Sequence, residues 1–507
     1  MNLPGLRQDG AWDLPERLNM AAQCLGQPAE QIAIIDLTEG ARRDVSYGAL
    51  GEMVDGLARA LMGAVAKGDR VGVLLSQSPW CAAAHLAIWK IGAISVPLFK
   101  LFKRDALASR VTDAGCQIVL TDAEGAAMLG DLAQAWLASE VGRAGADVPF
   151  AGTGPEDAAV LIYTSGTTGS PKGALHGHRV LTGHLPGVAM SHDLLGQAGD
   201  CLWTPADWAW IGGLFDVLMP GLALGVPVVA ARMTKFTPEG CARIVAEGDV
   251  RNVFFPPTAL RMLKAADVSL PGLRSVASGG EPLGAEMLAW GQQAFGLDIN
   301  EFYGQTECNM VASSCGAVFA ARPGCIGKAV PGHTVAVIDA AGNPTDAEGD
   351  VALRKGSAAM MLGYWNRPEA TAQKFRGDWM VTGDRGIWEG DYLHFVGRED
   401  DVITSAGYRI GPAEIEDCLL THEGVATCGV VGKPDVLRTE IVKAYVVRKP
   451  GSDVSAEVLQ KWVKERLASY SYPREIEFLD ALPMTVTGKV IRRELKAQAA
   501  REVEGST

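Results

Sequence analysis

Apolar residues in the first third of the chain recur at two different spacings. One set repeats at the interval of an amphipathic helix, which we expect to end before Gly68: Leu50, Met53, Leu57 and Leu61. Continuous apolar runs instead predict short buried strands at residues 71–75, 118–121 and 158–162. Alternation of helices with buried strands favours parallel sheets with helices packed on their faces. The pattern therefore predicts an α/β fold.

The pattern changes after residues 397–401, which read Gly-Arg-Glu-Asp-Asp. Pro412 stands where the first turn of a helix is expected to begin. Strands are predicted at residues 425–431 and 441–447, followed by a helix at residues 458–467. We therefore expect a large N-terminal domain of parallel sheets, residues 1–398, and a small mobile α+β domain, residues 399–507.

Composition narrows the classes of function. A net charge of -13 disfavours general binding of nucleic acid or of anionic membranes, and no apolar stretch predicts a spanning helix. The ten cysteines show no metal-ligand spacing and are expected to be buried free thiols. The start of the chain lacks the apolar core of a secretory signal, so a cytoplasmic protein is expected. A homo-oligomer is left open.

The strongest candidate for chemistry is residues 163–173, which read YTSGTTGSPKG after the predicted strand at 158–162. Glycines let backbone N–H groups approach an anion, hydroxyl groups donate further hydrogen bonds, and Lys172 adds positive charge. The spacing differs from that of a Walker loop, because Pro171 precedes the lysine and Gly173 follows it. The segment predicts a phosphate-binding loop; an ordinary turn is the alternative.

Together with SGGEPL at residues 278–283 and EFYGQTE at residues 301–307, this loop makes the chain resemble the adenylate-forming superfamily. That superfamily includes acyl-CoA synthetases, luciferases and the adenylation domains of peptide synthetases. The resemblance implies binding of ATP with Mg²⁺: Tyr303 would stack on adenine, Thr306 would bind the α-phosphate, and Glu307 would hold the metal. The implied nucleotide-binding residues of these three motifs are Thr164, Ser165, Gly166, Thr167, Thr168, Gly169, Lys172, Gly280, Glu281, Pro282, Glu301, Phe302, Tyr303, Gly304, Gln305 and Thr306.

Two later motifs complete the implied nucleotide site. VTGDRG at residues 381–386 places Asp384 on the ribose hydroxyls, and Arg398 adds a second ribose contact. In PMTVTGKVIRREL, Lys489 matches the catalytic lysine of the superfamily. A lysine that reaches both the attacking carboxylate and the α-phosphate would stabilise the charge that accumulates between them.

The small domain is also implied to meet coenzyme A. The resemblance implies that CoA is contacted by Ala406, Gly407, Tyr408, Arg409, Arg438, Lys464, Tyr472, Pro473 and Arg474. These residues are remote in sequence from Lys489, so the superfamily's rotation of the small domain between two half-reactions is expected here, with Asp400 at the hinge.

The acid pocket is expected where residues 204–213 read TPADWAWIGG. Relatives that use small acids carry tryptophan, valine and threonine at the positions of Gly304, Gly279 and Gly212, so this pocket is expected to be apolar and larger than acetate requires. Trp208, Trp210 and Phe302 are candidate lining residues. Packing of the two tryptophans in the core is the alternative.

The sequence therefore predicts an ATP-dependent acid–CoA ligase for a small-molecule carboxylic acid, of medium-chain or aromatic type, that releases AMP and pyrophosphate. Two other interpretations remain: a free-standing enzyme that loads a carrier-protein thiol, and a catalytically silent nucleotide-binding homologue. Joint retention of Glu307, Asp384 and Lys489 disfavours the silent homologue.

Overall fold

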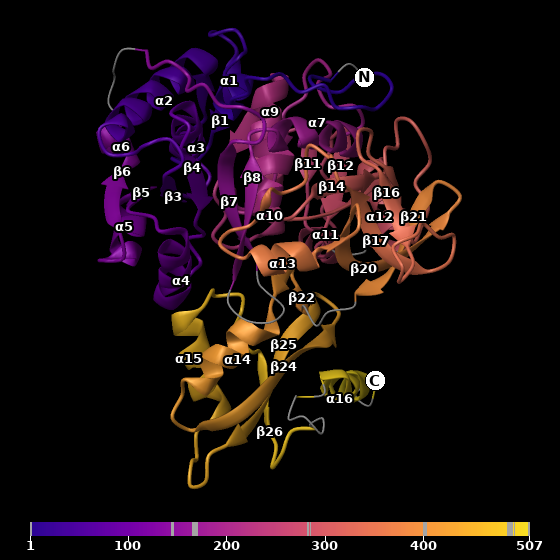
Figure 1. Cartoon of the computed structure of the whole chain (residues 1–507). Helices are drawn as coiled ribbons and strands as arrows, with labels where there is room; N and C mark the ends of the chain where they lie inside the picture. Colours follow the sequence, from indigo (N-terminus) through magenta and orange to yellow (C-terminus); the bar gives the residue numbers. More distant parts are fainter. Residues whose placement is uncertain are drawn as a thin grey trace. The chain divides into compact units, whose positions relative to one another are not determined.

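The computed structural model describes residues 3–142, 147–164, 171–280, 283, 285–398, 403–483, 490 and 492–504. The chain forms two compact units (Figure 1). The larger comprises Met1–Phe99, Ala114–Ile162 and Gly173–Gly397, and the smaller comprises Lys100–Asp113, Tyr163–Lys172 and Arg398–Thr507. The expected α/β fold, with a large N-terminal part and a smaller C-terminal one, is confirmed.

The larger unit contains a fourteen-stranded sheet of order β16-β17-β20-β21-β15-β14-β13-β12-β11-β9-β10-β1-β2, with β19 beside β20. Its strands are β1 (Ile32–Asp36), β2 (Arg43–Ser46), β9 (Leu202–Trp203), β10 (Val228–Ala230), β11 (Asn252–Phe254), β12 (Ser275–Gly279), β13 (Ile299–Gln305), β14 (Asn309–Ser313), β15 (Cys325–Ala329), β16 (Val335–Ile338), β17 (Gly349–Arg354), β19 (Phe375–Arg376), β20 (Trp379–Glu389) and β21 (Tyr392–Arg398). From β1 to β13 along this order the pairing is parallel, and from β13 to β15 it is antiparallel. The parallel part brings the carboxyl ends of β9, β11, β12 and β13 to one edge.

A second sheet has seven strands in the order β18-β8-β7-β4-β3-β5-β6. They are β3 (Arg70–Leu74), β4 (Ile94–Pro97), β5 (Ile118–Thr121), β6 (Gln134–Leu137), β7 (Ala158–Thr164), β8 (Lys172–Gly177) and β18 (Gly363–Tyr364). The three strands predicted from apolar runs correspond to β3, β5 and β7, and β5 has the predicted bounds. Strand β18 joins β8 from far along the chain, a pairing that the apolar pattern did not predict.

Helices accompany these sheets. Those before residue 398 are α1 (Met20–Cys24), α2 (Tyr47–Met62), α3 (Pro79–Lys90), α4 (Arg104–Ala114), α5 (Ala123–Leu129), α6 (Ala138–Val141), α7 (Val180–Ser191), α8 (Ile211–Gly213), η1 (Leu214–Leu218), α9 (Met219–Leu224), α10 (Pro238–Glu247), α11 (Pro257–Ala265), α12 (Ala285–Phe295) and α13 (Pro368–Gln373). The predicted amphipathic helix is α2, whose first turn is capped by the Ser46 hydroxyl. None of the helices in the described part of the chain is long and apolar enough to cross a membrane.

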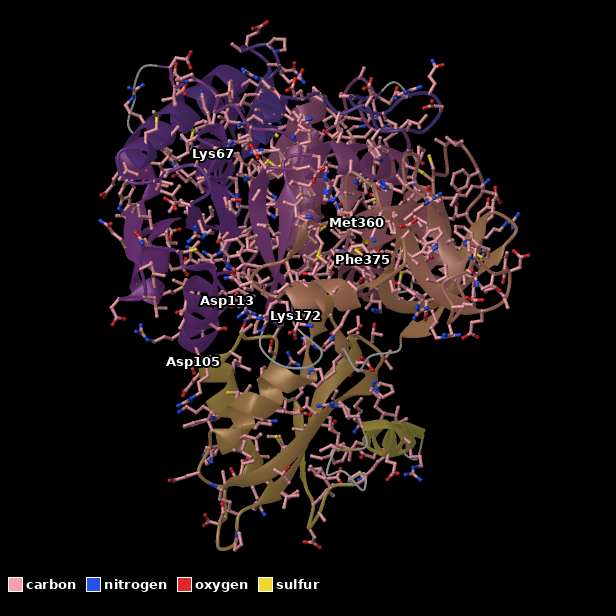
Figure 2. The ribbon with its side chains drawn as sticks, viewed as in Figure 1. Lys67, Asp105, Asp113, Lys172, Met360 and Phe375 are labelled. Atoms are coloured by element: carbon pink, nitrogen blue, oxygen red, sulfur yellow. The ribbon has the colours of Figure 1, made fainter. Side chains whose placement is uncertain are left out.

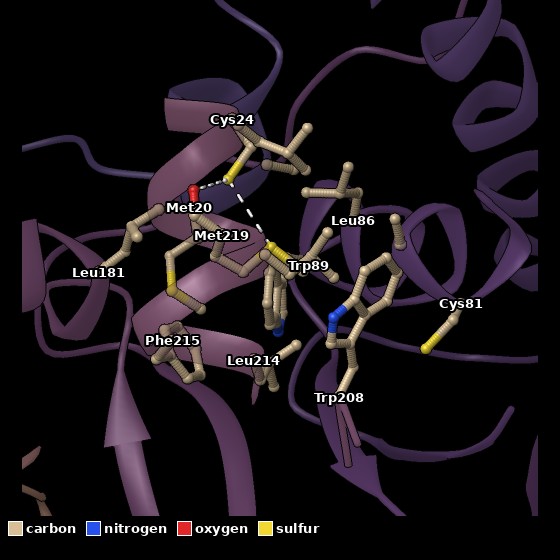
Figure 3. Close-up of a cluster of buried hydrophobic side chains, with 14 of the residues drawn as sticks. Met20, Cys24, Cys81, Leu86, Trp89, Leu181, Trp208, Leu214, Phe215 and Met219 are labelled. Atoms are coloured by element: carbon tan, nitrogen blue, oxygen red, sulfur yellow. Dashed lines mark hydrogen bonds between the residues drawn. The ribbon is translucent and has the colours of Figure 1, made fainter. Parts of the chain in front are cut away.

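The largest core cluster packs α1, α2, α3, α7, η1 and α9 around buried aromatic rings (Figure 3). Trp89, Trp208 and Phe215 are fully buried within it. Trp208 was a candidate lining residue of the acid pocket, but it is 0% exposed and belongs to this core. Trp208 therefore packs in the core, which was the alternative interpretation. Complete burial of its large apolar ring stabilises the fold. All ten cysteines are buried free thiols, as predicted.

The smaller unit contains a five-stranded sheet of order β23-β22-β25-β24, with β26 beside β25. Its elements are β22 (Ile403–Ser405), β23 (Tyr408–Ile410), α14 (Pro412–Leu420), β24 (Val425–Asp435), β25 (Thr439–Arg448), α15 (Ala456–Arg466), β26 (Glu475–Phe478) and α16 (Arg492–Glu504). Adjacent residues of β24 face opposite sides: Val430 packs in the cluster of α14 and α15, whereas Val431 packs in that of α16. Pro412 begins α14, as predicted.

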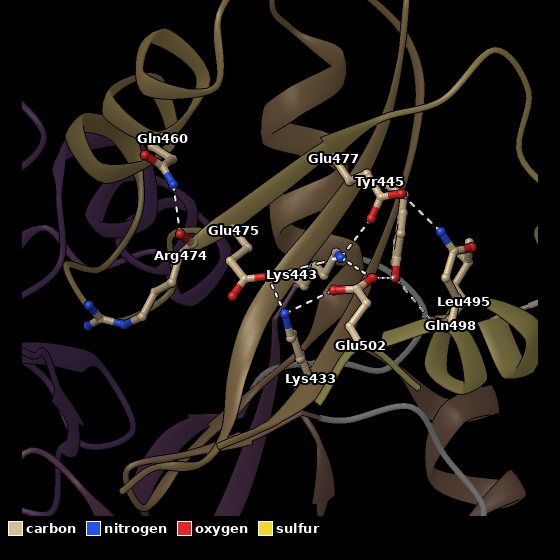
Figure 4. A network of polar contacts seen from close by, with 10 residues as sticks. All are labelled: Lys433, Lys443, Tyr445, Gln460, Arg474, Glu475, Glu477, Leu495, Gln498 and Glu502. Atoms are coloured by element: carbon tan, nitrogen blue, oxygen red, sulfur yellow. Dashed lines mark hydrogen bonds and ion pairs between the residues drawn. The ribbon is translucent and has the colours of Figure 1, made fainter. Parts of the chain in front are cut away.

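An ion-pair network around the buried Lys443 links α16 to this sheet (Figure 4). The Lys443 ammonium lies 2.7 Å from the Glu477 carboxylate and 2.5 Å from that of Glu502 on α16. Lys433 adds a 2.9 Å contact to Glu502. Burial disfavours the charged form of Glu502, but the hydrogen bonds from Lys443 and Lys433 outweigh burial and lower the pKa of Glu502 to about 2. The network therefore holds α16, the helix that follows the Lys489 motif in the sequence.

Candidate active site

A polar cluster joins two of the predicted nucleotide motifs. Asp384 on β20 is 2% exposed, and its Oδ2 accepts hydrogen bonds from the Tyr303 hydroxyl at 2.6 Å and from Gln305 Nε2 at 2.6 Å. Gln305 also donates to the carbonyl of Thr382 at 2.9 Å. Burial, followed by the charge of Asp384, raises the pKa of Tyr303 well above its usual value, so this hydroxyl stays a donor. Residues expected to meet adenine and ribose are thus adjacent.

Glu307 is held by a residue that the sequence analysis missed. The Tyr364 hydroxyl donates to Glu307 Oε1 at 2.5 Å, and the Met361 amide donates to the Glu307 carbonyl at 2.8 Å. Tyr364 reaches this position because β18 pairs with β8, with Tyr364 opposite Ala174. Its sequence context reads as a turn, so only the pairing of two distant segments reveals its role.

The segment before Tyr364 is anchored by one guanidinium. Arg179 Nη1 donates to the carbonyls of Ser357, Ala358 and Met360 at 3.1, 2.8 and 2.6 Å. Met360 and the half-buried Phe375 then pack in the apolar cluster that contains Cys308 (Figure 2). Burial raises the pKa of the Cys308 thiol to about 12, which disfavours the thiolate form that a nucleophile needs.

Glu301 is hydrogen-bonded to the segment that follows β12. Its Oε1 accepts a hydrogen bond from the Leu283 amide at 3.0 Å, and the residue is 8% exposed. Burial raises the pKa of Glu301 to about 7, opposed by that hydrogen bond. Gly280, directly after β12, adopts a φ of 99°, a conformation that favours glycine. Direct contact of either residue with nucleotide stays a prediction.

The two ends of the predicted phosphate loop are joined at its base. The Thr164 hydroxyl, at the end of β7, donates to the carbonyl of Lys172 at 3.4 Å, where β8 begins. Tyr163 donates from its hydroxyl to Asp113 Oδ2 at 2.8 Å. The strands that flank the predicted loop, β7 and β8, are therefore neighbours in the sheet.

Several predicted site residues lie outside the described part of the chain. They are Ser165, Gly166, Thr167, Thr168, Gly169, Glu281, Pro282, Asp400 and Lys489, together with the side chains of Arg398 and Arg409.

Two of the predicted acid-pocket residues, Gly279 and Phe302, lie on neighbouring parallel strands, close to a ring that the sequence analysis did not name. Phe254 ends β11, Gly279 ends β12, and Phe302 lies beside Gly279 on β13. The rings of Phe254 and Phe302 are 5.1 Å apart at 56°. A Cβ on Gly279 would lie 2.5 Å from the Phe302 ring, and one on Gly212 would lie 3.0 Å from the Phe254 ring. Ligands of open α/β sheets bind at such strand ends.

These distances correct the expected size argument. The space that a side chain would take at Gly279 is occupied by Phe302, and at Gly212 the Phe254 ring is already close. At Gly304 a Cβ would lie 1.8 Å from the Asn309 carbonyl oxygen, because the backbone of β14 approaches there. The missing side chains therefore do not by themselves create open space at these three positions; at Gly279 and Gly212 the paired rings of Phe302 and Phe254 lie close by. Trp210 is half-buried and meets Phe99 edge to face at 5.9 Å.

In the smaller unit, the structure brings several predicted CoA residues together. Arg474 Nη1 donates to the Tyr472 hydroxyl at 3.0 Å, and the Lys464 ammonium lies 5.3 Å from the Tyr472 ring centre. Burial, followed by the nearby charge of Arg474, lowers the pKa of Arg438. The Arg438 carbonyl accepts from the amide of Ala406 at 3.0 Å.

Next to this basic cluster, Tyr408 stacks on Tyr470 with ring centres 4.0 Å apart. Ala406 and Gly407 both have positive φ, of 54° and 80°, in the turn between β22 and β23. Positive charge gathered beside aromatic faces suits a ligand that carries phosphates and a purine. Pro473 lies between Tyr472 and Arg474 in the same segment.

Comparison with known proteins decides the family. The family model described as AMP-binding enzyme matches residues 20–365, and that of the AMP-binding enzyme C-terminal domain matches residues 414–489. The chain belongs to the AMP-binding enzyme family. It is an AMP-forming acid–CoA ligase, ATP-dependent and adenylate-forming, that acts on a small-molecule carboxylic acid.

Relatives within this family carry different substrate names. The chain is 33% identical to the acetyl-coenzyme A synthetase of Bacillus subtilis (strain 168), over 95% of this chain and 90% of that protein. It is 37% identical to the mitochondrial acyl-coenzyme A synthetase ACSM2 of Rattus norvegicus, over 68% of this chain and 62% of that protein. The solved o-succinylbenzoate CoA synthetase of Bacillus subtilis matches with a TM-score of 0.85 and 26% identity, covering 95% of this chain and 98% of that one.

Proposed function

We propose that this ligase activates medium-chain or aromatic carboxylic acids. The observation that carries this proposal is the aromatic wall formed by Phe254, at the carboxyl end of β11, and Phe302, which lies on β13 opposite the last residue of β12. Two rings 5.1 Å apart offer a broad apolar surface to an alkyl chain or an aryl ring, and acetate has too little apolar area to benefit from it.

Adenylation is assigned to Asp384, Thr306 and Lys489 together with the predicted phosphate loop. Asp384 accepts the ribose hydroxyls, with its carboxylate oriented by Tyr303 and Gln305. Thr306 and the phosphate loop bind the phosphates, and Lys489 stabilises charge between the attacking carboxylate and the α-phosphate. These groups act by positioning and electrostatics, so no covalent enzyme intermediate is required.

Glu307 is proposed to hold Mg²⁺. Among the described residues, no group of three or more His, Cys, Asp or Glu side chains is placed to bind a metal. That fits Mg²⁺, which is usually bound by one or two carboxylates together with substrate phosphates. A bound Mg²⁺ would neutralise the charge that develops on the phosphates. Tyr364 fixes the Glu307 carboxylate that would meet it.

Thioester formation is assigned to the basic and aromatic cluster of the smaller unit. Arg438, Lys464 and Arg474 supply local positive charge for the phosphates of CoA, which an acidic chain otherwise lacks. We propose that residues 399–507 act as the mobile part, with Asp400 at the hinge, and that residues 1–398 bind the nucleotide and the acid.

Separate assays of the two half-reactions test this assignment. Lys489→Ala should abolish pyrophosphate release from ATP and acid, while CoA consumption from supplied acyl-adenylate should persist. Arg474→Ala should do the reverse. Equal losses in both half-reactions for both variants would contradict the division of roles.

A further inference from the structure

The described residues include one buried acid in the π-helical turn η1 that the proposed reaction does not use. Asp216 is 3% exposed and is flanked in η1 by the fully buried Phe215 and Val217. Asp216 Oδ1 accepts a hydrogen bond from Asn309 Nδ2 at 2.8 Å. Within the described residues, Asn309 is the one hydrogen-bond partner of the Asp216 carboxyl group.

The other carboxyl oxygen of Asp216, Oδ2, lies close to the backbone of Gly212, which also adjoins the Phe254 ring. A Cβ built on Gly212 would lie 3.5 Å from Asp216 Oδ2 and 3.0 Å from the Phe254 ring. Oδ2 is therefore next to the aromatic wall, across a glycine that has no side chain to cover it. Gly212 is half-buried, whereas Asp216 and Phe254 are buried, so the carboxyl group is less accessible than the glycine beside it.

Such a position is costly for a purely structural residue. A carboxyl group can use about four acceptor positions when ionised, and burying it with few partners carries a desolvation penalty. Burial raises the pKa of Asp216 to about 7 despite the hydrogen bond from Asn309. Buried polar groups rarely keep unused hydrogen-bonding capacity. In addition, π-helical turns are frequent at functional sites.

We propose that Asp216 gives the acid pocket a polar inner end that accepts a hydrogen bond from a hydroxyl group of the substrate. The preferred acids would be hydroxylated members of the medium-chain or aromatic class, with the hydroxyl remote from the reacting carboxylate. This inference rests on the proposed location of the acid pocket. The acid pocket would then have an aromatic wall and one polar group, the Asp216 carboxyl, and would not be apolar throughout.

The alternative is that the hydrogen bond between Asp216 and Asn309 has a structural role only. Asn309 has a positive φ of 48° at the start of β14, immediately after the Thr306–Glu307 motif, and Asp216 could serve only to hold it. Asp216→Asn separates the two roles, because the asparagine carbonyl can still accept from Asn309 while its NH₂ group replaces Oδ2. The hydrogen bond from Asn309 is kept, and Oδ2, which accepts when the carboxyl group is ionised, is replaced by a group that can only donate.

The test compares matched acids that differ by one substituent: a parent acid, its hydroxyl derivative and its keto derivative, in alkyl and benzoate series. AMP release with ATP and CoA gives kcat/KM for each. Wild type should favour at least one hydroxy acid over its parent by about tenfold or more, since a site built for a hydroxyl rejects analogues that lack it. Asp216→Asn should lose that ratio and shift preference toward the keto acid.

Asp36→Asn is the matched control, because Asp36 is also 3% exposed but lies on β1, where it pairs with Arg43 at 2.7 Å. Its hydroxy-to-parent ratio should equal that of wild type. A wild type with no hydroxy preference in any series overturns the inference, as does an Asp216→Asn variant with an unchanged ratio. If no acid of the panel supports CoA-dependent AMP release, the proposed substrate class fails instead.

Discussion

Strand β13 has two unlike faces, one polar and one aromatic, and we propose that the first serves ATP binding and the second serves acid selection. Tyr303 and Gln305 lie two residues apart and both donate to Asp384. Phe302, between Glu301 and Tyr303, instead packs its ring against Phe254. Successive side chains of a strand point to opposite faces, so one strand serves both functions. The polar face is fixed by several hydrogen bonds, whereas the aromatic face is shaped by ring packing alone.

Loss of the Asp384 carboxylate should have the largest effect. Asp384→Ala removes the acceptor of two hydrogen bonds, each worth about 1.5–3 kcal/mol when one partner is charged. We expect kcat/KM for ATP to fall by about 100-fold or more, by a similar factor with every acid. Asp36→Ala is the control for loss of a buried acid. An effect that depends strongly on the acid would show that the two faces of β13 are not independent.

Tyr364→Phe should have a more selective effect than Asp384→Ala, because it acts on the metal-binding role proposed for Glu307. Without the hydroxyl on Glu307 Oε1, we expect the Mg²⁺ concentration for half-maximal pyrophosphate release to rise about tenfold. Direct binding of Mn²⁺ in the presence of ATP, followed by its paramagnetic resonance, should weaken in parallel.

The matched control is Tyr47→Phe, which removes a buried hydroxyl that donates to Leu222 at 2.8 Å. It should leave the Mg²⁺ dependence unchanged. A Tyr364→Phe enzyme with wild-type metal dependence but lowered stability would make Tyr364 structural only.

Gly304→Ala should have the smallest effect of the three and tests the corrected size argument. Its new Cβ would meet the Asn309 carbonyl oxygen, so we expect a loss of about 1–3 kcal/mol in the free energy of unfolding. Activity should fall by the same factor for short and long acids. Gly51→Ala, on α2, has open space around its Cβ and should cost no stability. A selective loss of long acids would restore Gly304 as the gate of the pocket.

Motif order in the sequence predicted that Tyr303 and Asp384 share one site, and the structure places them in hydrogen-bonding distance. Tyr364 could not be predicted, because its position depends on the pairing of β18 with a strand that is distant in sequence. Gly304 and Gly279 were interpreted as empty space, but a sequence does not show which neighbour fills the place of a missing side chain. The prediction that Trp208 lines the acid pocket was wrong for a related reason: an apolar ring next to a site motif can pack equally well in a core.

The central claim is that the aromatic wall selects the acid. The most direct measurement is the rate of CoA-dependent AMP release across straight-chain acids from acetate to dodecanoate and a set of benzoates, in wild type and Phe302→Ala. Wild type should prefer medium-chain or aryl acids, and Phe302→Ala should lower kcat/KM for those acids by about tenfold while the KM for ATP stays unchanged. A wild type that prefers acetate, or a Phe302→Ala variant with the wild-type order of preference, would contradict the account.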